Sequence, residues 1–92
     1  MFMITGKQQQ SRVDSDKSRA VHIYGVEFRI PTAYEYKWAA VDKDGYMRLF
    51  VNRPRYSAGD GEHYTERGME FNLCIVYYTG DPRDSVVQLP AE

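Results

Sequence analysis

Apolar and polar residues alternate along most of the chain from residue 21 onward, which is the pattern of half-buried β-strands. The segment 21–30 changes phase at Gly25, a residue that strand interiors use at bulges and sharp bends. This predicts either one bulged strand or two short strands, ended by Pro31. Three aromatic residues at positions 34, 36 and 38 have a period of two, so a strand is favoured over a helix capped by Thr32.

The clearest local signal is the turn sequence Asp42-Lys43-Asp44-Gly45. Asp is favoured at the start of a type I turn, and glycine suits the left-handed residue of the bulge that follows. The turn sets the pairing of two strands: Asp42 with Tyr46, Val41 with Met47, Ala39 with Leu49 and Trp38 with Phe50. One side of this ribbon is core material, comprising Ala39, Val41, Met47, Leu49 and Val51. The other side, which is a candidate contact face, carries Tyr36, Trp38, Ala40, Arg48 and Phe50.

The remaining segments complete a mainly β prediction. Residues 52–68 form a long polar connection, and residues 70–79 have apolar character on both faces, which is typical of a central strand. Residues 85–89 can add an edge strand before Pro90. We expect a mainly β fold, with α+β as the alternative, built as one small antiparallel sheet or partly open barrel of four or five strands. Residues 1–19 are too polar to form a core and predict a mobile arm, which leaves 20–92 as a single β-rich domain.

Size and charge narrow the functional classes. The chain has 92 residues, a formal net charge of -1 and an isoelectric point near 6.1, so it lacks the strongly basic character of a dedicated duplex-binding module. A single cysteine cannot form an intramolecular disulfide. The apolar start of the chain is too short for a signal peptide or a membrane span. The expected location is therefore the cytoplasm, without membrane association.

No pattern for catalysis or metal binding stands out. His22 and His63 lie far apart without ligand spacing, and His63 is interpreted as a surface residue of a mobile loop. The turn at Asp42 cannot be a calcium loop, because Val51 takes the place where a bidentate glutamate is needed. Cys74 is interpreted as a buried structural thiol. We therefore expect no enzyme activity, no cofactor and no metal.

Aromatic residues and arginines carry the remaining functional signal. The chain contains eight tyrosines and is 14% aromatic, and such side chains anchor interfaces. Two hypotheses follow: protein–protein recognition, or binding of single-stranded nucleic acid by stacking and arginine contacts. The near-neutral charge favours the first. The expected partner-binding residues are Tyr36, Trp38, Arg48, Phe50, Arg53, Arg55 and Tyr56. Acidic side chains in turns and loops are further candidate contacts: Asp42, Asp44, Asp60, Glu62 and Glu66. The domain is expected as a monomer or as a dimer through an edge strand.

The segment from Trp38 to Pro54 resembles a pattern in small phage and prophage proteins. In those proteins an aromatic-rich strand leads into "AVD-x-DG", a second strand and a "KP"-type step, which is Arg53-Pro54 here. The resemblance implies a phage origin. It further implies a class of function, the stoichiometric inhibition of a host factor, of which anti-CRISPR proteins are one group. The implied partner is a host protein or ribonucleoprotein complex of bacterial defence.

Overall fold

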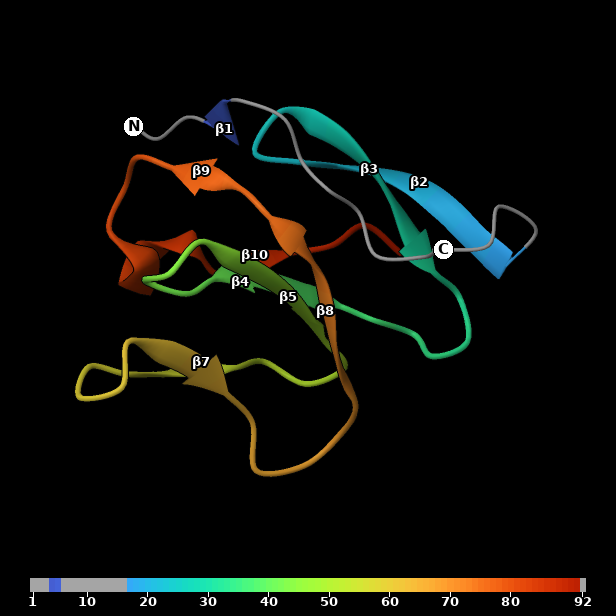
Figure 1. Cartoon of the computed structure of the whole chain (residues 1–92). Coiled ribbons are helices and arrows are strands. Elements are labelled where there is room, and N and C mark those ends of the chain that lie inside the picture. Colours follow the sequence, from blue (N-terminus) through green and yellow to red (C-terminus); the bar gives the residue numbers. More distant parts are fainter. Residues whose placement is uncertain (1–3, 6–16, 92) are drawn as a thin grey trace.

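The computed structural model describes residues 4–5 and 17–91, which form ten short strands and one 3-10 helix (Figure 1). The predicted mainly β chain with antiparallel pairing is confirmed. One sheet has four strands in the order β10-β4-β5-β8, and three further pairs are β2-β3, β6-β7 and β1-β9. The bounds are β1 Ile4–Thr5, β2 Ser18–Ile23, β3 Val26–Pro31, β4 Trp38–Val41, β5 Tyr46–Phe50, β6 Arg55–Ser57, β7 Glu62–Tyr64, β8 Glu70–Ile75, β9 Tyr77–Tyr78, η2 Pro82–Ser85 and β10 Val87–Gln88.

The β4–β5 hairpin has the predicted register. Trp38 pairs with Phe50, Ala39 with Leu49 and Val41 with Met47. The Asp42 carbonyl accepts the Gly45 N–H at 2.9 Å, as in a type I turn, and Gly45 has a φ of 91°, as in the accompanying bulge. Local turn chemistry therefore determines which residues of this hairpin share a face.

The two faces of the four-stranded sheet are covered by different hairpins, which gives three layers. The β2–β3 hairpin contributes four buried residues to the main core, together with Ala39, Val41, Met47 and Leu49 of the sheet. The opposite face, with the buried Ala40 and Phe50, is approached by β6–β7, which contacts β4. In Figure 1 the β2–β3 hairpin lies above the sheet and β7 lies below it.

One alternative left open by the sequence is decided, and two further segments differ from the expectation. Of the two alternatives predicted around Gly25, the two short strands are confirmed, and they are joined by Tyr24 and Gly25 with φ values of 54° and 80°. Such a pair of positive φ angles is the two-residue turn that matches hairpin twist. The 52–68 connection also contains structure, because β6 and β7 pair within it. The aromatic segment 34–37 is not a strand, and β4 begins at Trp38.

The C-terminal third departs from the prediction at one strand. β8 lies at the end of the four-stranded sheet rather than at its centre. The register shifts between Met47 and Arg48, so that Met47 pairs with Cys74 and Arg48 with Asn72. This bulge lets Leu73 and Cys74, two consecutive residues, both be buried. The expected edge strand near the C-terminus is present as β10.

Parts of the expected N-terminal arm belong to strands. Ser18 and Arg19 belong to β2, where Arg19 pairs with Ile30. Ile4 and Thr5 pair with Tyr78 and Tyr77 of β9. The rest of the expected arm, residues 1–3 and 6–16, lies outside the described residues.

Candidate functional site

A buried acid–histidine pair joins the turn of the β4–β5 hairpin to the β6–β7 hairpin. Asp42 Oδ1 accepts the backbone N–H of His63 at 2.8 Å and lies 3.0 Å from His63 Nδ1. His63 is 0% exposed and Asp42 is 2% exposed. A carboxylate can only accept, so Nδ1 is assigned as the protonated ring nitrogen. The expectation of a surface histidine is wrong for His63, and that of an exposed acidic contact is wrong for Asp42.

Arg48 links this pair to two further carboxylates. Its Nε lies 3.1 Å from Asp42 Oδ2, and its terminal nitrogens lie 3.6 Å from Glu62 and 3.2 Å from Glu70. The Asp42 contact has the distance of an ion pair without the alignment of a hydrogen bond. Arg48 therefore connects β5 to β7 and β8. Its guanidinium serves the fold, which leaves it poorly placed for the partner contact that the sequence predicts.

Two of the aromatic residues expected on an exposed face are core residues. Phe50 is 0% exposed and Tyr36 is 4% exposed, because other parts of the chain cover them. Their expected position on an exposed contact face is corrected. Burial of a phenylalanine side chain contributes about 1.5–3 kcal/mol to folding, so Phe50 has a clear structural role.

Trp38 and Arg53 remain at the surface as a stacked pair. The Arg53 guanidinium carbon lies 5.0 Å from the centre of the Trp38 ring, and Trp38 is half-buried. A cation over an indole face is restrained in its orientation, and the edge of the guanidinium stays available for hydrogen bonds. These two residues are compatible with the contact role that the sequence predicts.

The β6–β7 hairpin has distinct inner and outer faces. Tyr56 and His63 form a cross-strand pair on the inner face, with ring centres 4.9 Å apart. Arg55 and Tyr64 form the next pair on the outer face, where Tyr64 is 41% exposed. Residues that alternate in direction along a strand produce this division. The Arg83 guanidinium carbon lies 5.6 Å from the centre of the Tyr56 ring, and Tyr56 is only partly exposed.

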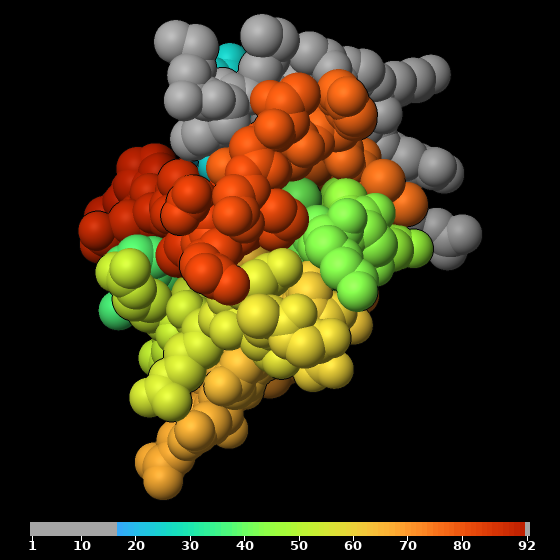
Figure 2. Space-filling model, turned by 90° about the vertical axis from the view of Figure 1, so that its left-hand side faces the viewer, coloured from blue at the N-terminus to red at the C-terminus, as the bar shows by residue number. Residues whose placement is uncertain are grey.

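The hairpin tip is seated on the β4–β5 turn. Lys43 donates its backbone N–H to the Gly61 carbonyl at 2.9 Å. In the space-filling view the yellow hairpin lies directly below the green turn, at the lower end of the molecule (Figure 2). Together with the buried pair, this contact holds the inner face of the hairpin against the sheet. The outer face therefore belongs to a hairpin whose position on the sheet is fixed by these contacts.

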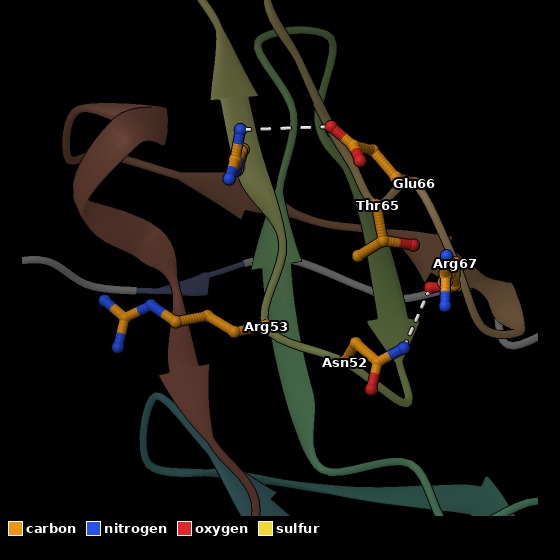
Figure 3. A pocket seen from close by; sticks show the side chains of 6 residues that line it. Asn52, Arg53, Thr65, Glu66 and Arg67 are labelled. Carbon is orange, nitrogen blue, oxygen red and sulfur yellow. Dashed lines mark hydrogen bonds and ion pairs between the residues drawn. The ribbon is translucent and has the colours of Figure 1, made fainter.

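A basic pocket lies beside the outer face of the hairpin (Figure 3). It has a volume of about 240 Å³ and is lined by Asn52, Arg53, Arg55, Thr65, Glu66 and Arg67. Asn52 donates its side-chain N–H to the Arg67 carbonyl at 2.9 Å, which ties the segment before β6 to the segment after β7. The lining thus contains three arginines and one carboxylate. Such a pocket suits an anionic group.

The other acidic residues predicted as contacts have local partners. Asp60 accepts the Ser57 hydroxyl at 3.1 Å, and Asp44 accepts the Tyr46 N–H at 3.3 Å. Glu66 lies 4.0 Å from Arg55, with more than two thirds of each side chain exposed. Contacts of this kind between exposed groups are weak, so these carboxylates remain accessible to a partner.

Several ionisable groups have pKa values shifted by burial. Burial raises the pKa of the Cys74 thiol to about 11, so the thiol is protonated at neutral pH, in keeping with the structural role expected for it. Burial also raises the pKa of Tyr24, whose hydroxyl donates to the Ser85 carbonyl. The Ser85 Oγ accepts the Val41 N–H at 2.8 Å, so η2 is fastened to β4.

Sequence reasoning missed Tyr64 and Arg67 as candidates for the site. The signal that could have identified Tyr64 is the polar–His–polar sequence Glu62-His63-Tyr64, in which His63 must face inward if the flanking residues face outward. Arg67 follows the strand in an irregular segment, where no pattern fixes a direction. Arg53 and Arg55 were predicted, and the structure brings them together with Arg67 in one pocket.

Comparisons with known proteins add nothing to this description of the site. No family model matches the chain, no curated protein resembles it significantly, and no solved structure matches its fold. Among residues 4–5 and 17–91 there is no group of three or more metal-ligating side chains. The same residues contain no helix long and apolar enough to cross a membrane.

Proposed function

We propose that this protein is a stoichiometric binding protein without catalytic activity, and that it engages a partner protein through the outer face of the β6–β7 hairpin. The observation that carries this proposal is the cross-strand pair of Arg55 and the half-exposed Tyr64 on a hairpin whose inner face is locked by Asp42 and His63. Tyrosine and arginine dominate the binding energy of protein interfaces. A rigid support lowers the ordering cost of presenting them.

The charge distribution favours a protein partner over single-stranded nucleic acid. Glu62 and Glu66 lie on or beside the same hairpin as its arginines, and the whole chain has a formal net charge of -1. Carboxylates among the arginines repel successive phosphates, whereas they can pair with the mixed charges of a protein surface. The proposed contact set is Trp38, Arg53, Arg55, Tyr64 and Arg67, with Tyr56 at its margin.

The resemblance to phage proteins suggests which partners to examine first. On that basis we propose a phage-encoded inhibitor acting in the bacterial cytoplasm, with a defence complex such as a CRISPR effector as the host factor. A compact binder of this kind acts by occluding a working surface, so inhibition should follow a one-to-one titration. The hairpin face supports binding, and the resemblance supplies the biological setting.

The test is affinity capture from a bacterial lysate with the intact chain, compared with a Tyr64→Ala/Arg55→Gln variant. The expected result is a protein that survives nuclease treatment, is retained by the wild type and by a Tyr34→Ala control, and is lost with the double variant. Tyr34 is a suitable control because it is similarly exposed and lies before β4, outside the hairpin. Capture that disappears with nuclease, or that is equal for all three chains, contradicts the proposal.

A further inference from the structure

We infer that the arginine-lined pocket beside the hairpin receives carboxylate groups of an acidic protein segment, and that Glu66 acts there as an internal competitor. This inference rests on the proposed function and specifies the chemistry of the partner at the same surface. Arg53, Arg55 and Arg67 all line one pocket, and Glu66 is the single carboxylate residue of its lining. An incoming carboxylate would therefore find more positive than negative charge.

Two of the three guanidinium groups are available for a partner. In the part of the chain that the structure describes, Arg53 and Arg67 make no ion pair, and both are exposed. The Arg53 guanidinium lies over the Trp38 ring, and this contact restrains it before any ligand arrives. An arginine fork pairs with a carboxylate through two parallel hydrogen bonds, so each available fork is a ready carboxylate site.

The third guanidinium is occupied only loosely. Glu66 approaches Arg55 to 4.0 Å, at the outer limit of an ion pair, and side-chain exposures of 77% and 75% leave both groups in water. Replacement of the Arg55–Glu66 contact by one with a partner carboxylate therefore costs little free energy. While it stays in place, Glu66 both occupies Arg55 and repels an approaching anion. These two effects make Glu66 a competitor for the ligand.

The arrangement favours several carboxylates along a segment over one compact anion. Arg53 extends to the left in Figure 3 and Arg67 lies at the right, with Thr65 and Asn52 between them. Acidic side chains spaced along a peptide suit arginines that are separated in this way. Glu62 nearby is paired with Arg48 and adds negative charge, which weakens the pocket for a phosphate backbone of higher charge density.

The probe for this inference is a synthetic deca-glutamate peptide, titrated against the intact chain at low ionic strength. A deca-thymidylate oligonucleotide and inorganic phosphate serve as comparison ligands. We expect Arg67→Gln to weaken peptide binding about fivefold or more and Glu66→Gln to strengthen it about threefold, which is the range expected for one exposed charge contact. Lys37→Gln and Glu27→Gln change the same charges at exposed positions outside the pocket and should leave the affinity within about 1.5-fold of the wild type.

The outcomes separate this inference from the proposed function. Failure of the wild type to bind the peptide, or a Glu66→Gln variant that binds no tighter than Glu27→Gln, overturns the inference. Tighter binding of the oligonucleotide than of the peptide overturns it in favour of a phosphate ligand. In each of these cases the proposed function still stands if capture of the protein partner depends on Tyr64 and Arg55. If capture shows no such dependence while the peptide result holds, the proposed function fails and the carboxylate site remains.

Discussion

Asp42 Oδ1 accepts both the backbone N–H and the Nδ1–H of His63, two residues that are 21 positions apart and almost completely buried. This pair joins the two hairpins whose relative placement creates the candidate surface. The same carboxylate also faces Arg48 at 3.1 Å. One side chain thus accepts two hydrogen bonds and forms an ion pair, and the geometry of the hairpin depends on it.

Replacement of Asp42 by alanine should lower the free energy of unfolding by about 3 kcal/mol. The reason is that the His63 N–H groups would lose their acceptor and the Arg48 guanidinium its buried ion-pair partner, in a site with little access to water. Urea denaturation followed by fluorescence measures the change. Asp44→Ala, in the same turn but exposed, is the matched control and should alter stability by less than about 0.5 kcal/mol. Equal effects of the two substitutions would show that the buried pair does not support the fold.

Replacement of Phe50 by alanine should cost about 3–5 kcal/mol, because it opens a cavity beneath the β6–β7 hairpin. Phe50→Leu conserves much of the volume and should cost less than about 1.5 kcal/mol. Thermal or chemical unfolding of the two variants provides the measurement. If the Phe50→Ala protein kept its stability but failed to bind its partner, Phe50 would be a contact residue and not a core residue.

Gly61→Ala should destabilise the chain by about 1 kcal/mol. Gly61 has a φ of 71°, which is costly for any residue with a Cβ, and the added methyl group would meet the Lys43 side chain. Gly59→Ala is the control, since no atom lies within 4 Å of its added Cβ and its φ is unstrained. Amide hydrogen exchange at Lys43, whose N–H binds the Gly61 carbonyl, should become faster in Gly61→Ala alone. Similar exchange rates in both variants would contradict the seating of the hairpin on this turn.

Stability should decline as the pH rises from about 9 to about 11. Burial raises the pKa of Cys74 from 9.0 to about 11, so between these values the unfolded chain loses a proton that the folded chain keeps. The stabilisation is fully present below pH 9 and is lost as the pH approaches the folded-state value. Denaturation midpoints measured across this range, for the wild type and for Cys74→Ala, test the claim. A pH dependence in this window that persists unchanged in the variant would mean that other groups, such as the buried tyrosines, cause it.

Sequence reasoning succeeded where structure is decided by neighbouring residues. The Asp42-Lys43-Asp44-Gly45 turn determines its own geometry, and the pairing of Trp38 with Phe50 follows from it. The alternation around Gly25 and the apolar residues of β8 were equally visible. Such features need only the period of the side chains and the chemistry of the turn.

The burial of the candidate contact face of the β4–β5 ribbon could not be predicted from neighbouring residues in the same way. Phe50 is buried on the sheet face that the hairpin from the polar 52–68 segment approaches, and this approach depends on contacts such as Asp42 with His63 that span 21 positions. The alternation around His63 indicates which way it would face in a strand, but it does not indicate which part of the chain covers it. Arg48 likewise has the pattern of a surface residue, and only the fold brings Asp42, Glu62 and Glu70 to it.

The most direct test of the central claim is isothermal titration of the captured partner with the wild type and with Tyr64→Ala/Arg55→Gln. We predict one-to-one binding by the wild type and a loss of at least about 30-fold in affinity for the variant, as expected for interface anchors of about 2 kcal/mol. The unfolding free energy of the variant should stay within about 0.5 kcal/mol of the wild type, because both side chains point away from the core. An affinity that does not change in a folded variant would show that the partner binds elsewhere on the molecule.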